Sequence, residues 1–390
     1  MFSKLPSQPR AILPLGQPVT FYESPRAVQG NTSQRPTEIP SKRHDRQTKD
    51  LTRRFPELQP ASKLLRPLLQ ASEAVEGATS RHDPVTGQRL DFGQIFDESL
   101  RRSARVAAFA SGPSGSDVRV VQAQLQKQGW ADSRDIWIEV PVFAGEESVW
   151  HSDAAPVQQV CFAKPIDSGE CLLAVRMITR TVILKPVLRK AGPGRLDVNE
   201  LCEVRMSQTG HVPHAHVTFN PWFTRQFAIV DQTGNWSLWE FGNREARTAA
   251  ESHSCRDDAG SLASDNPLND GWARIAWIYD PNTILLATRD EVSLYAISAG
   301  PQKIEKIDVG VRSDAGWILD ISLLPGHIDK LCILTSTHLQ IMVVHEDGNQ
   351  VQTRTMLHIR HQRSPEDITL GLTAWEDGEG KHPDSQVIYY

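Results

Sequence analysis

Residues 214–241 read HAHVTFNPWFTRQFAIVDQTGNWSLWEF, and this stretch decides the fold. Apolar and polar residues alternate over Val217–Phe219, as in a half-buried strand, and Asn220-Pro221 ends that strand. Phe227–Val230 is a second run of β-forming residues, and the alternation returns at Trp236–Trp239 after a turn rich in Asp, Gly and Asn. These three short strands cannot bury both faces of their own sheet, so the unit needs sister units beside it.

Units of the same plan recur on both sides of this stretch. Their first strands, aligned at Val160, Val217, Ile275 and Ile321, are 57, 58 and 46 residues apart. These spacings are somewhat longer than the roughly 40–45 residues of a WD-type propeller blade. The extra residues of each unit fall in polar loops. The longest of these, residues 243–269, we expect to be an inserted surface loop. The repeats predict an all-β fold, a β-propeller of degenerate WD-like blades over residues 105–390.

The C-terminal residues begin one more unit. Residues 367–375 predict its first strand, and the chain stops within the second, at residues 386–390. An unclosed last blade would leave an apolar edge exposed. We therefore expect a propeller that is incomplete at its C-terminus, in a chain that is a fragment of a longer protein.

Residues 1–54 predict a disordered basic arm. They contain ten Lys or Arg against four Asp or Glu, a net of +6, and since the formal total is −5 the rest of the chain carries −11. A cluster of cations in the arm could contact nucleic-acid phosphates or direct nuclear import; the alternative is a solvated tail without a partner. The candidate nucleic-acid contacts are Lys42, Arg43, Arg46, Lys49, Arg53 and Arg54.

Residues 55–104 predict a short helical lead-in to the propeller. Four leucines at positions 64, 65, 68 and 69 have helix-like spacing, with Pro67 inside the pattern, which indicates a kinked or two-part helix. We expect a second short helix over Gln94–Arg105.

Composition narrows the class of protein. The five cysteines form no CxxC pair and have no regular spacing, which favours idle thiols in a reducing compartment. No apolar run approaches the ~18 residues of a membrane span, and the N-terminus has no secretory signal core, so we expect a soluble intracellular protein with no membrane partner.

Catalytic motifs are missing from the sequence. There is no GxSxG, HExxH, GxGxxG or Walker A pattern, so we expect no enzyme, no cofactor and no catalytic residue. His211, His214 and His216 could supply zinc ligands, but no Cys or carboxylate stands at ligand spacing. A structural role fits better: Gly210-His211 precedes the first strand, and Asp231 lies in the turn where a WD-type blade bonds such a histidine.

The candidate site residues are therefore structural. They form the motif of one blade and its packing to neighbouring blades, and they are His211, Phe219, Asn220, Pro221, Trp222, Asp231, Trp236 and Trp239.

The run Val217–Glu240, with VTFNPW followed by RQFAIVDQTGNWSLW, resembles the propeller region of the fungal RNA polymerase I-specific transcription initiation factor family. Leu90–Gly93 (LDFG) and Ala107–Gly112 (AAFASG) resemble the same family, and the likeness extends over about residues 85–345. Members of that family are the WD-repeat subunit of the core factor, which recruits RNA polymerase I to the ribosomal DNA promoter.

The resemblance implies a non-catalytic scaffold in the nucleus and nucleolus. Its partners would be the TFIIB-like and TPR-containing core-factor subunits and RNA polymerase I, with promoter DNA reached mainly through the complex. Because the body of the chain is acidic, any direct DNA contact is expected through the basic arm. Two other classes stay open: a generic WD-repeat adaptor for a chromatin or ubiquitin-ligase complex, and a propeller enzyme, which would need acidic side chains converging in the central channel.

Overall fold

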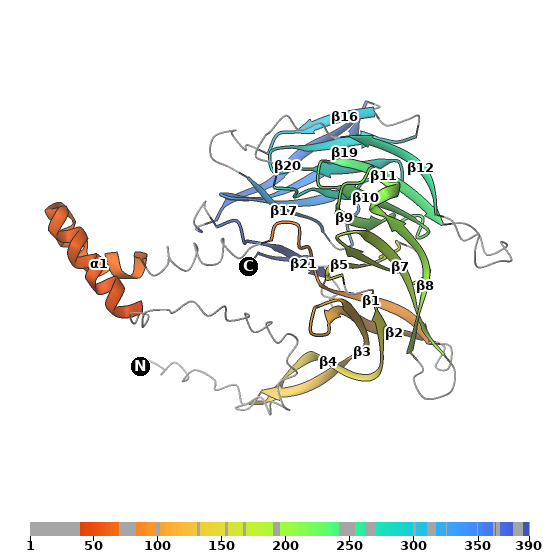
Figure 1. Ribbon diagram of the computed structural model, residues 1–390, viewed down its shortest axis with the longest axis horizontal. Coiled ribbons are helices and arrows are strands. Elements are labelled where there is room, and N and C mark those ends of the chain that lie inside the picture. Colours follow the sequence, from red (N-terminus) through yellow and green to blue (C-terminus); the bar gives the residue numbers. More distant parts are fainter. Residues whose placement is uncertain are drawn as a thin grey trace. The chain divides into compact units, whose positions relative to one another are not determined.

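The computed structural model describes residues 40–69, 83–97, 102–130, 133–152, 155–166, 169–189, 196–241, 254–261, 270–298, 302–309, 317–324, 326–348, 350–361, 363, 367–376 and 385–389 (Figure 1). Nearly all of these residues from 90 onward lie in antiparallel strands or the turns between them. The strands divide between two compact units, which contain Val85–Ala263 and Ser264–Tyr390. The predicted all-β class is confirmed.

The first unit holds three modules of four strands in sequence order. Module one comprises β1 (Leu90–Asp97), β2 (Arg102–Ser111), β3 (Asp117–Trp130) and β4 (Ser133–His151). Module two comprises β5 (Val157–Phe162), β6 (Leu173–Met177), β7 (Arg180–Leu188) and β8 (Leu196–Arg205). Module three comprises β9 (His214–Phe219), β10 (Gln226–Asp231), β11 (Asn235–Phe241) and β12 (Ser254–Ser261). A single parallel pair between β1 and β7, at Asp97 and Leu188, joins modules one and two into one eight-stranded sheet.

The second unit holds two modules of the same kind and one hairpin. Module four comprises β13 (Arg274–Trp277), β14 (Thr283–Ala287), β15 (Val292–Ala296) and β16 (Gln302–Ile307). Module five comprises β17 (Ile318–Leu323), β18 (Lys330–Thr335), β19 (His338–Asp347) and β20 (Gln350–Arg360). The hairpin of β21 (Leu372–Glu376) and β22 (Ser385–Tyr389) agrees with the predicted start of one more unit.

A register shift recurs at the same place in all five modules. Each module has a bulge where its third strand pairs with its fourth, for example at Leu238/Trp239, at Leu294/Tyr295 and at Ile341/Met342. A bulge bends one strand relative to its neighbour and increases the local twist. The modules therefore share a geometry that their divergent sequences do not show.

The buried apolar side chains lie between consecutive modules, where one sheet faces the next. One cluster joins β1–β3 to β5–β8, and a second joins β6–β8 to β9–β11. In the second unit, a cluster joins β14 and β15 to β17–β19, and another joins β17–β19 to Leu370 and Leu372 at the start of β21. Face-to-face packing of successive small sheets is the arrangement expected of propeller blades.

The outermost strand of several modules was missed by the sequence prediction. β8, β16 and β20 follow the three strands that the pattern indicated, and β12 lies inside residues 243–269, which were expected to be a structureless surface loop. Side chains of β16 and β20 are mostly exposed or half-buried, so these strands lack the apolar runs of the inner strands. The prediction of an insertion is therefore wrong for Ser254–Ser261, which pair with β11.

The predicted helix over Gln94–Arg105 is also wrong. Gln94–Asp97 lie in β1 and Arg102–Arg105 lie in β2, where Gln94 pairs with Arg105 across an antiparallel hairpin, and residues 98–101 lie outside the described residues. In the part of the chain that the structure describes, the first strand thus begins at Leu90, upstream of the predicted propeller boundary at residue 105.

The N-terminal region contains helices where disorder was expected. Residues 1–39 lie outside the described residues, but Pro40–Arg54 form helix α1, so the predicted disordered arm is wrong for this part. A 3-10 turn η1 (Pro56–Ala61) and a helical segment at residues 62–69 follow, so the four leucines are helical as predicted, but the segment continues through Pro67 without the predicted division there. No helix among the described residues is both long and apolar enough to cross a membrane.

Candidate functional site: the blade motif and two buried arginine networks

The Asn-Pro-Trp turn of module three is held by one side chain. Asn220 is fully buried, and its Oδ1 accepts hydrogen bonds from the backbone amides of Trp222 (2.9 Å) and Phe223 (3.3 Å). Its Nδ2 donates to Oε1 of Gln226 at 2.6 Å, across the turn from β9 to β10. Asparagine suits this position because its short amide can satisfy backbone groups two residues ahead. The carbonyl of Pro221 accepts the amide of Ile166, which attaches the turn to module two.

The aromatic residues of the predicted motif are core residues. Phe219 and Trp239 are buried in the cluster between modules two and three, where the rings of Phe219 and Phe227 lie 6.3 Å apart. Trp236 is also buried, and β12 approaches its ring so closely that a Cβ on Gly260 would lie 2.6 Å from it. Trp222, by contrast, is only half-buried.

The histidine assignment needs a correction. His211 is exposed and has a positive φ of 68°, and both carboxylate oxygens of Asp231 accept hydrogen bonds within their own turn, from Thr233 and Asn235. The predicted bond between His211 and Asp231 is therefore wrong. Of the three histidines that the sequence singled out, His214, the first residue of β9, is the buried one.

His214 bridges two threonines. Its Nδ1 lies 2.9 Å from Oγ1 of Thr181, and its Nε2 lies 2.9 Å from Oγ1 of Thr209. Burial, and then the positive charge of Arg176, lower the pKa of His214 to about 4. The imidazole is therefore neutral at physiological pH, and its two hydrogen bonds join β9 to module two.

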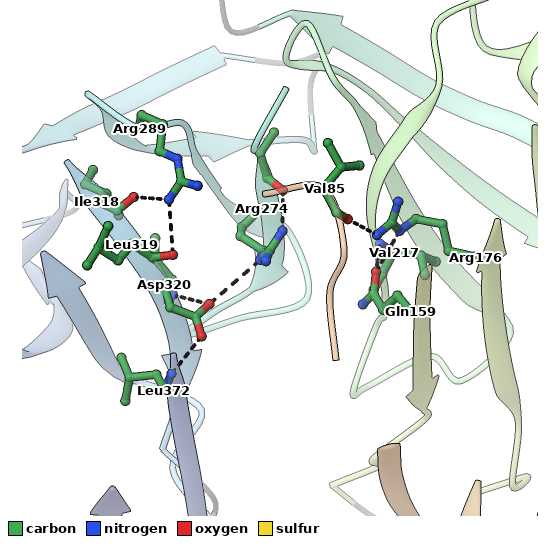
Figure 2. A network of polar contacts seen from close by, with 12 residues as sticks. Val85, Gln159, Arg176, Val217, Arg274, Arg289, Ile318, Leu319, Asp320 and Leu372 are labelled. Carbon is green, nitrogen blue, oxygen red and sulfur yellow. Dashed lines mark hydrogen bonds and ion pairs between the residues drawn. The ribbon is translucent and has the colours of Figure 1, made fainter. Parts of the chain in front are cut away.

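Arg176, in β6, is the centre of the first buried network (Figure 2). Its Nε donates to Oε1 of Gln159 at 3.2 Å, and its Nη1 donates to Oε1 of Gln158 and to the carbonyl of His214, both at 2.7 Å. Its Nη2 donates to the carbonyl of Val85. Gln159 in turn bonds both the amide and the carbonyl of Val217. One guanidinium thus connects modules two and three to the segment that precedes β1.

Arg289 is the centre of the second network, in the other unit (Figure 2). Its Nη1 donates to the carbonyl of Ile318 at 2.9 Å, and its Nε forms an ion pair with Asp270 at 2.9 Å. The guanidinium carbon lies 4.6 Å from the ring centre of Trp272 and 5.4 Å from that of Trp317. Such cation–π contacts are strongest where water is excluded, and the Arg289 side chain is 5% exposed.

Arg274 and Asp320 extend the second network to the last hairpin. Arg274 lies over the ring of Trp272 at 4.9 Å and forms an ion pair with Asp320 at 3.8 Å. Oδ2 of Asp320 accepts the amide of Leu372, the first residue of β21, at 2.9 Å (Figure 2). Burial raises the pKa of Asp320. The positive charge of Arg274 and the hydrogen bonds from the amides of Leu372 and Ile321 act in the opposite direction and lower it by less.

The two networks make the same kind of connection at two places in the chain. Each arginine lies near the end of its module's second strand and donates to the first residue of the next module's first strand. The sequence prediction missed both arginines. The signal that could have found them was a lone cation in or directly after an apolar strand, in LAVRM (173–177) and TILLATR (283–289).

The stretch LDFG at the start of β1 is tied to β5. Oδ2 of Asp91 accepts the amide of Phe162 at 2.7 Å, and its Oδ1 pairs with Lys164 at 3.1 Å. A Cβ at Gly93 would lie 2.5 Å from the Phe162 ring, so only glycine allows this approach.

Helix α1 brings together the basic residues that the sequence singled out. At 3.6 residues per turn, positions 42, 43, 46, 49, 53 and 54 fall within about 140° of the helix circumference, together with Asp50. Arg46, Lys49, Arg53 and Arg54 are exposed. We call this side of the helix the basic face of α1.

The His, Cys, Asp and Glu side chains among the described residues are the candidates for metal binding, and four free cysteines are the candidates for reactive thiols. No three His, Cys, Asp or Glu side chains among these residues are arranged to hold a metal ion. Burial raises the pKa of Cys161, Cys171, Cys202 and Cys332 to about 12, which makes these thiols poor nucleophiles.

Comparison with known proteins gives one family match. The model of the family described as Rrn6, beta-propeller matches residues 83–390. No curated protein matches the chain by sequence.

Three solved structures resemble the chain, and the first of them shares its fold. The crystal structure of the Saccharomyces cerevisiae core factor matches with a TM-score of 0.62 and 15% identity, over 80% of this chain and 48% of that chain. This chain thus spans less than half the length of that relative. S. cerevisiae Sqt1 matches with a TM-score of 0.43 and 11% identity, over 74% of this chain and 66% of that one. The β-propeller domain of Myceliophthora thermophila Cps50 (Swd1) matches with a TM-score of 0.40 and 10% identity, over 69% of this chain and 72% of that one.

Proposed function

Because the chain belongs to the Rrn6 β-propeller family, we propose that it is a non-catalytic scaffold subunit of the RNA polymerase I core factor. In this role it promotes assembly of the pre-initiation complex at the ribosomal DNA promoter. It acts in the nucleus and nucleolus, and its direct partners are the TFIIB-like and TPR-containing subunits of the core factor, through which it meets RNA polymerase I.

The observation that carries this proposal is the extent of the family match. It begins at residue 83, seven residues before β1, and continues through every strand of both units. Two of the sequence motifs that resemble the family, in Leu90–Gly93 and Val217–Glu240, lie where neighbouring modules contact each other.

The physical character of the modules supports a scaffold. Hydrogen-bonded arginines and continuous apolar clusters lie between successive sheets, so the sheets within each unit form stiff bodies. Fully burying one large apolar side chain stabilises a fold by about 1.5–3 kcal/mol. The apolar clusters between successive sheets each contain several such side chains. Stiff sheets hold their edges and loops in fixed positions, which is what a subunit that positions other proteins needs.

Charge supports protein partners for the β-modules. Residues 55–390 carry a formal net charge of −11, which opposes the close approach of phosphates to this part of the chain. In this proposal promoter DNA is reached mainly through the assembled complex.

The test is reconstitution with the two expected partners. The tagged full chain is co-expressed with the TFIIB-like and the TPR-containing subunits of its own organism and purified in two steps, ending in gel filtration. We expect the three proteins to elute together in equal amounts. Trp239→Ala, which removes a core side chain, should reduce recovery of the partners, whereas the exposed-site control His211→Gln should not.

A second measurement identifies the partners without choosing them in advance. Affinity purification from nuclei should recover both core-factor subunits and RNA polymerase I. Recovery of a cullin adaptor or of histones, without either core-factor subunit, would instead establish a generic WD-repeat adaptor and overturn the proposal.

A further inference from the structure

We propose that the basic face of α1 is a binding site for the phosphate backbone of duplex DNA. The helix spans fifteen residues, Pro40–Arg54, and six of them are Lys or Arg against two Asp. That the phosphates belong to DNA rests on the proposed function. That the helix binds phosphates is inferred from the arrangement of its cations.

The opposite side of α1 is already engaged within the chain. Thr48, Leu51 and Thr52 are half-buried, and Asp45 forms an ion pair with Arg66, in the helical segment after η1, at 3.1 Å. This pairing neutralises one of the two acidic residues of the helix. On the basic face, Arg46, Lys49, Arg53 and Arg54 are exposed, and Asp50 is its only acidic residue in the described helix.

The dimensions of the helix suit a duplex. Positions 42 and 53 are eleven residues apart, which is about 16 Å along the helix axis at 1.5 Å per residue. Double-stranded DNA carries one charge per ~1.7 Å of its axis, so this length of helix meets several phosphates. An α-helix also fits the major groove, about 12 Å wide, from which its cations reach the phosphates on either side.

The composition of the helix favours duplex phosphates over single-stranded nucleic acid. Proteins that bind single strands combine cations with aromatic side chains on which bases stack. The α1 sequence PSKRHDRQTKDLTRR contains no Phe, Tyr or Trp. Binding through α1 is therefore electrostatic and independent of base sequence.

The first test removes charge from the basic face. The full chain is titrated into a fluorescent 30-base-pair duplex at 50 to 200 mM KCl, and anisotropy gives the Kd. Arg46→Gln/Lys49→Gln/Arg53→Gln should lower the slope of log Kd against log salt by about 3, because each phosphate-binding cation contributes a slope of about 1. Glutamine preserves the helix because its helix propensity is close to that of Lys and Arg.

The matched control removes the same charge elsewhere. Arg354→Gln/Arg360→Gln/Arg363→Gln takes three exposed cations from β20 and the segment after it, so the net charge changes equally. This variant should keep the wild-type slope. If the two triple variants weaken binding equally, general electrostatics explains the binding and the site is refuted.

The second test breaks the helix without removing any cation. Thr48→Pro interrupts α1 in its middle, at a cost of about 3 kcal/mol to the helix, whereas Ser41→Pro lies in the first turn, where proline is tolerated. We expect weaker binding for Thr48→Pro only. If Thr48→Pro bound the duplex as tightly as the wild-type chain, the proposal that the helix positions the cations for binding would be refuted.

Competition decides the class of ligand. Unlabelled duplex DNA should displace the probe at lower concentration than single-stranded RNA or polyglutamate of equal charge, and equal displacement by either one would overturn the assignment to duplex DNA. The basic-face variant should still co-purify with the core-factor subunits. Loss of co-purification in the wild-type chain would refute the proposed function alone, because DNA binding is measured separately.

Discussion

The Arg289 guanidinium donates a hydrogen bond of 2.9 Å to the carbonyl of Ile318, the first residue of β17. Arg176 makes the matching contact of 2.7 Å to the carbonyl of His214, the first residue of β9. The two arginines are not at the same register position, since Arg176 lies within β6 and Arg289 lies two residues after β14. Both nevertheless connect the second strand of one module to the first strand of the next.

Arg289→Met should destabilise the second unit by about 3 kcal/mol, because it leaves Asp270 and the carbonyl of Ile318 without their buried donor. The measurement is the urea midpoint, followed by tryptophan fluorescence, since Trp272 and Trp317 flank the guanidinium. Arg354→Met, at an exposed site on β20, is the control. Equal midpoints for the two variants would show that the network contributes nothing to stability.

A chain that starts at residue 83 should be more stable than one that starts at residue 90. The carbonyl of Val85 accepts from Arg176, the amide of Gly87 donates to Gln158, and the carbonyl of Gln88 accepts the amide of Val160. Removing this segment leaves the Arg176 guanidinium without one of its buried acceptors. We expect the melting temperature to fall by several degrees on removal of residues 83–89, by differential scanning fluorimetry. Equal melting temperatures would show that the segment is not part of the fold.

Acidification should destabilise the fold through His214. Its pKa is about 4 in the folded chain and 6.5 in the reference state, so between these values the unfolded chain binds a proton that the folded chain does not. Stability is therefore fully present above pH 6.5 and is lost as the pH falls toward 4. The loss is about 1.4 kcal/mol per pH unit, or roughly 2 kcal/mol from pH 6.5 to 5.

The corresponding variant is His214→Gln, compared with the exposed-site control His211→Gln. His214→Gln should be less stable at pH 7 because its hydrogen bonds with Thr181 and Thr209 change, yet it should lose about 2 kcal/mol less than wild type on moving to pH 5. Urea unfolding at the two pH values measures both quantities. If the stability of His214→Gln fell as steeply with pH as that of His211→Gln, His214 would not be the source of the pH dependence.

Trp239→Ala should destabilise the first unit by about 3–5 kcal/mol, the usual cost of removing a large buried aromatic ring. Trp239 is 3% exposed, packs in the cluster between modules two and three, and donates from Nε1 to Oγ of Ser237 at 2.7 Å. Phe223→Ala, at a ring that is 59% exposed, is the control. An unchanged melting temperature in Trp239→Ala would show that this residue is not part of the core.

Several elements could be predicted because their signal is local. The inner strands β9, β10 and β11 follow from apolar alternation interrupted by Asn-Pro and by an Asp/Gly/Asn turn, and the structure places Phe219, Trp236 and Trp239 in the core as expected. The outer strands carry little of this signal. β20 pairs with β19 along its length, yet most of its side chains are exposed, so its sequence has no apolar period to detect.

Other predictions were wrong because the structure of the residue or segment depends on a contact with a residue elsewhere in the chain. The predicted helix over Gln94–Arg105 contains residues compatible with a helix, but Gln94–Asp97 and Arg102–Arg105 pair with each other as antiparallel strands. His211 has the local setting of a WD-type histidine, whereas the position between modules is occupied by His214, because Thr181 and Thr209 are there to bond it.

The sequence by itself determined the class of fold, the repeated plan and the family, because these depend on the order of apolar residues and turns along the chain. Only the tertiary structure decided which polar groups join the modules. Arg176 and His214 are 38 residues apart, and Arg289 and Ile318 are 29 apart. Their hydrogen bonds exist only once two sheets have packed face to face, since a buried guanidinium is stable only where carbonyls and side-chain oxygens are already positioned to receive it.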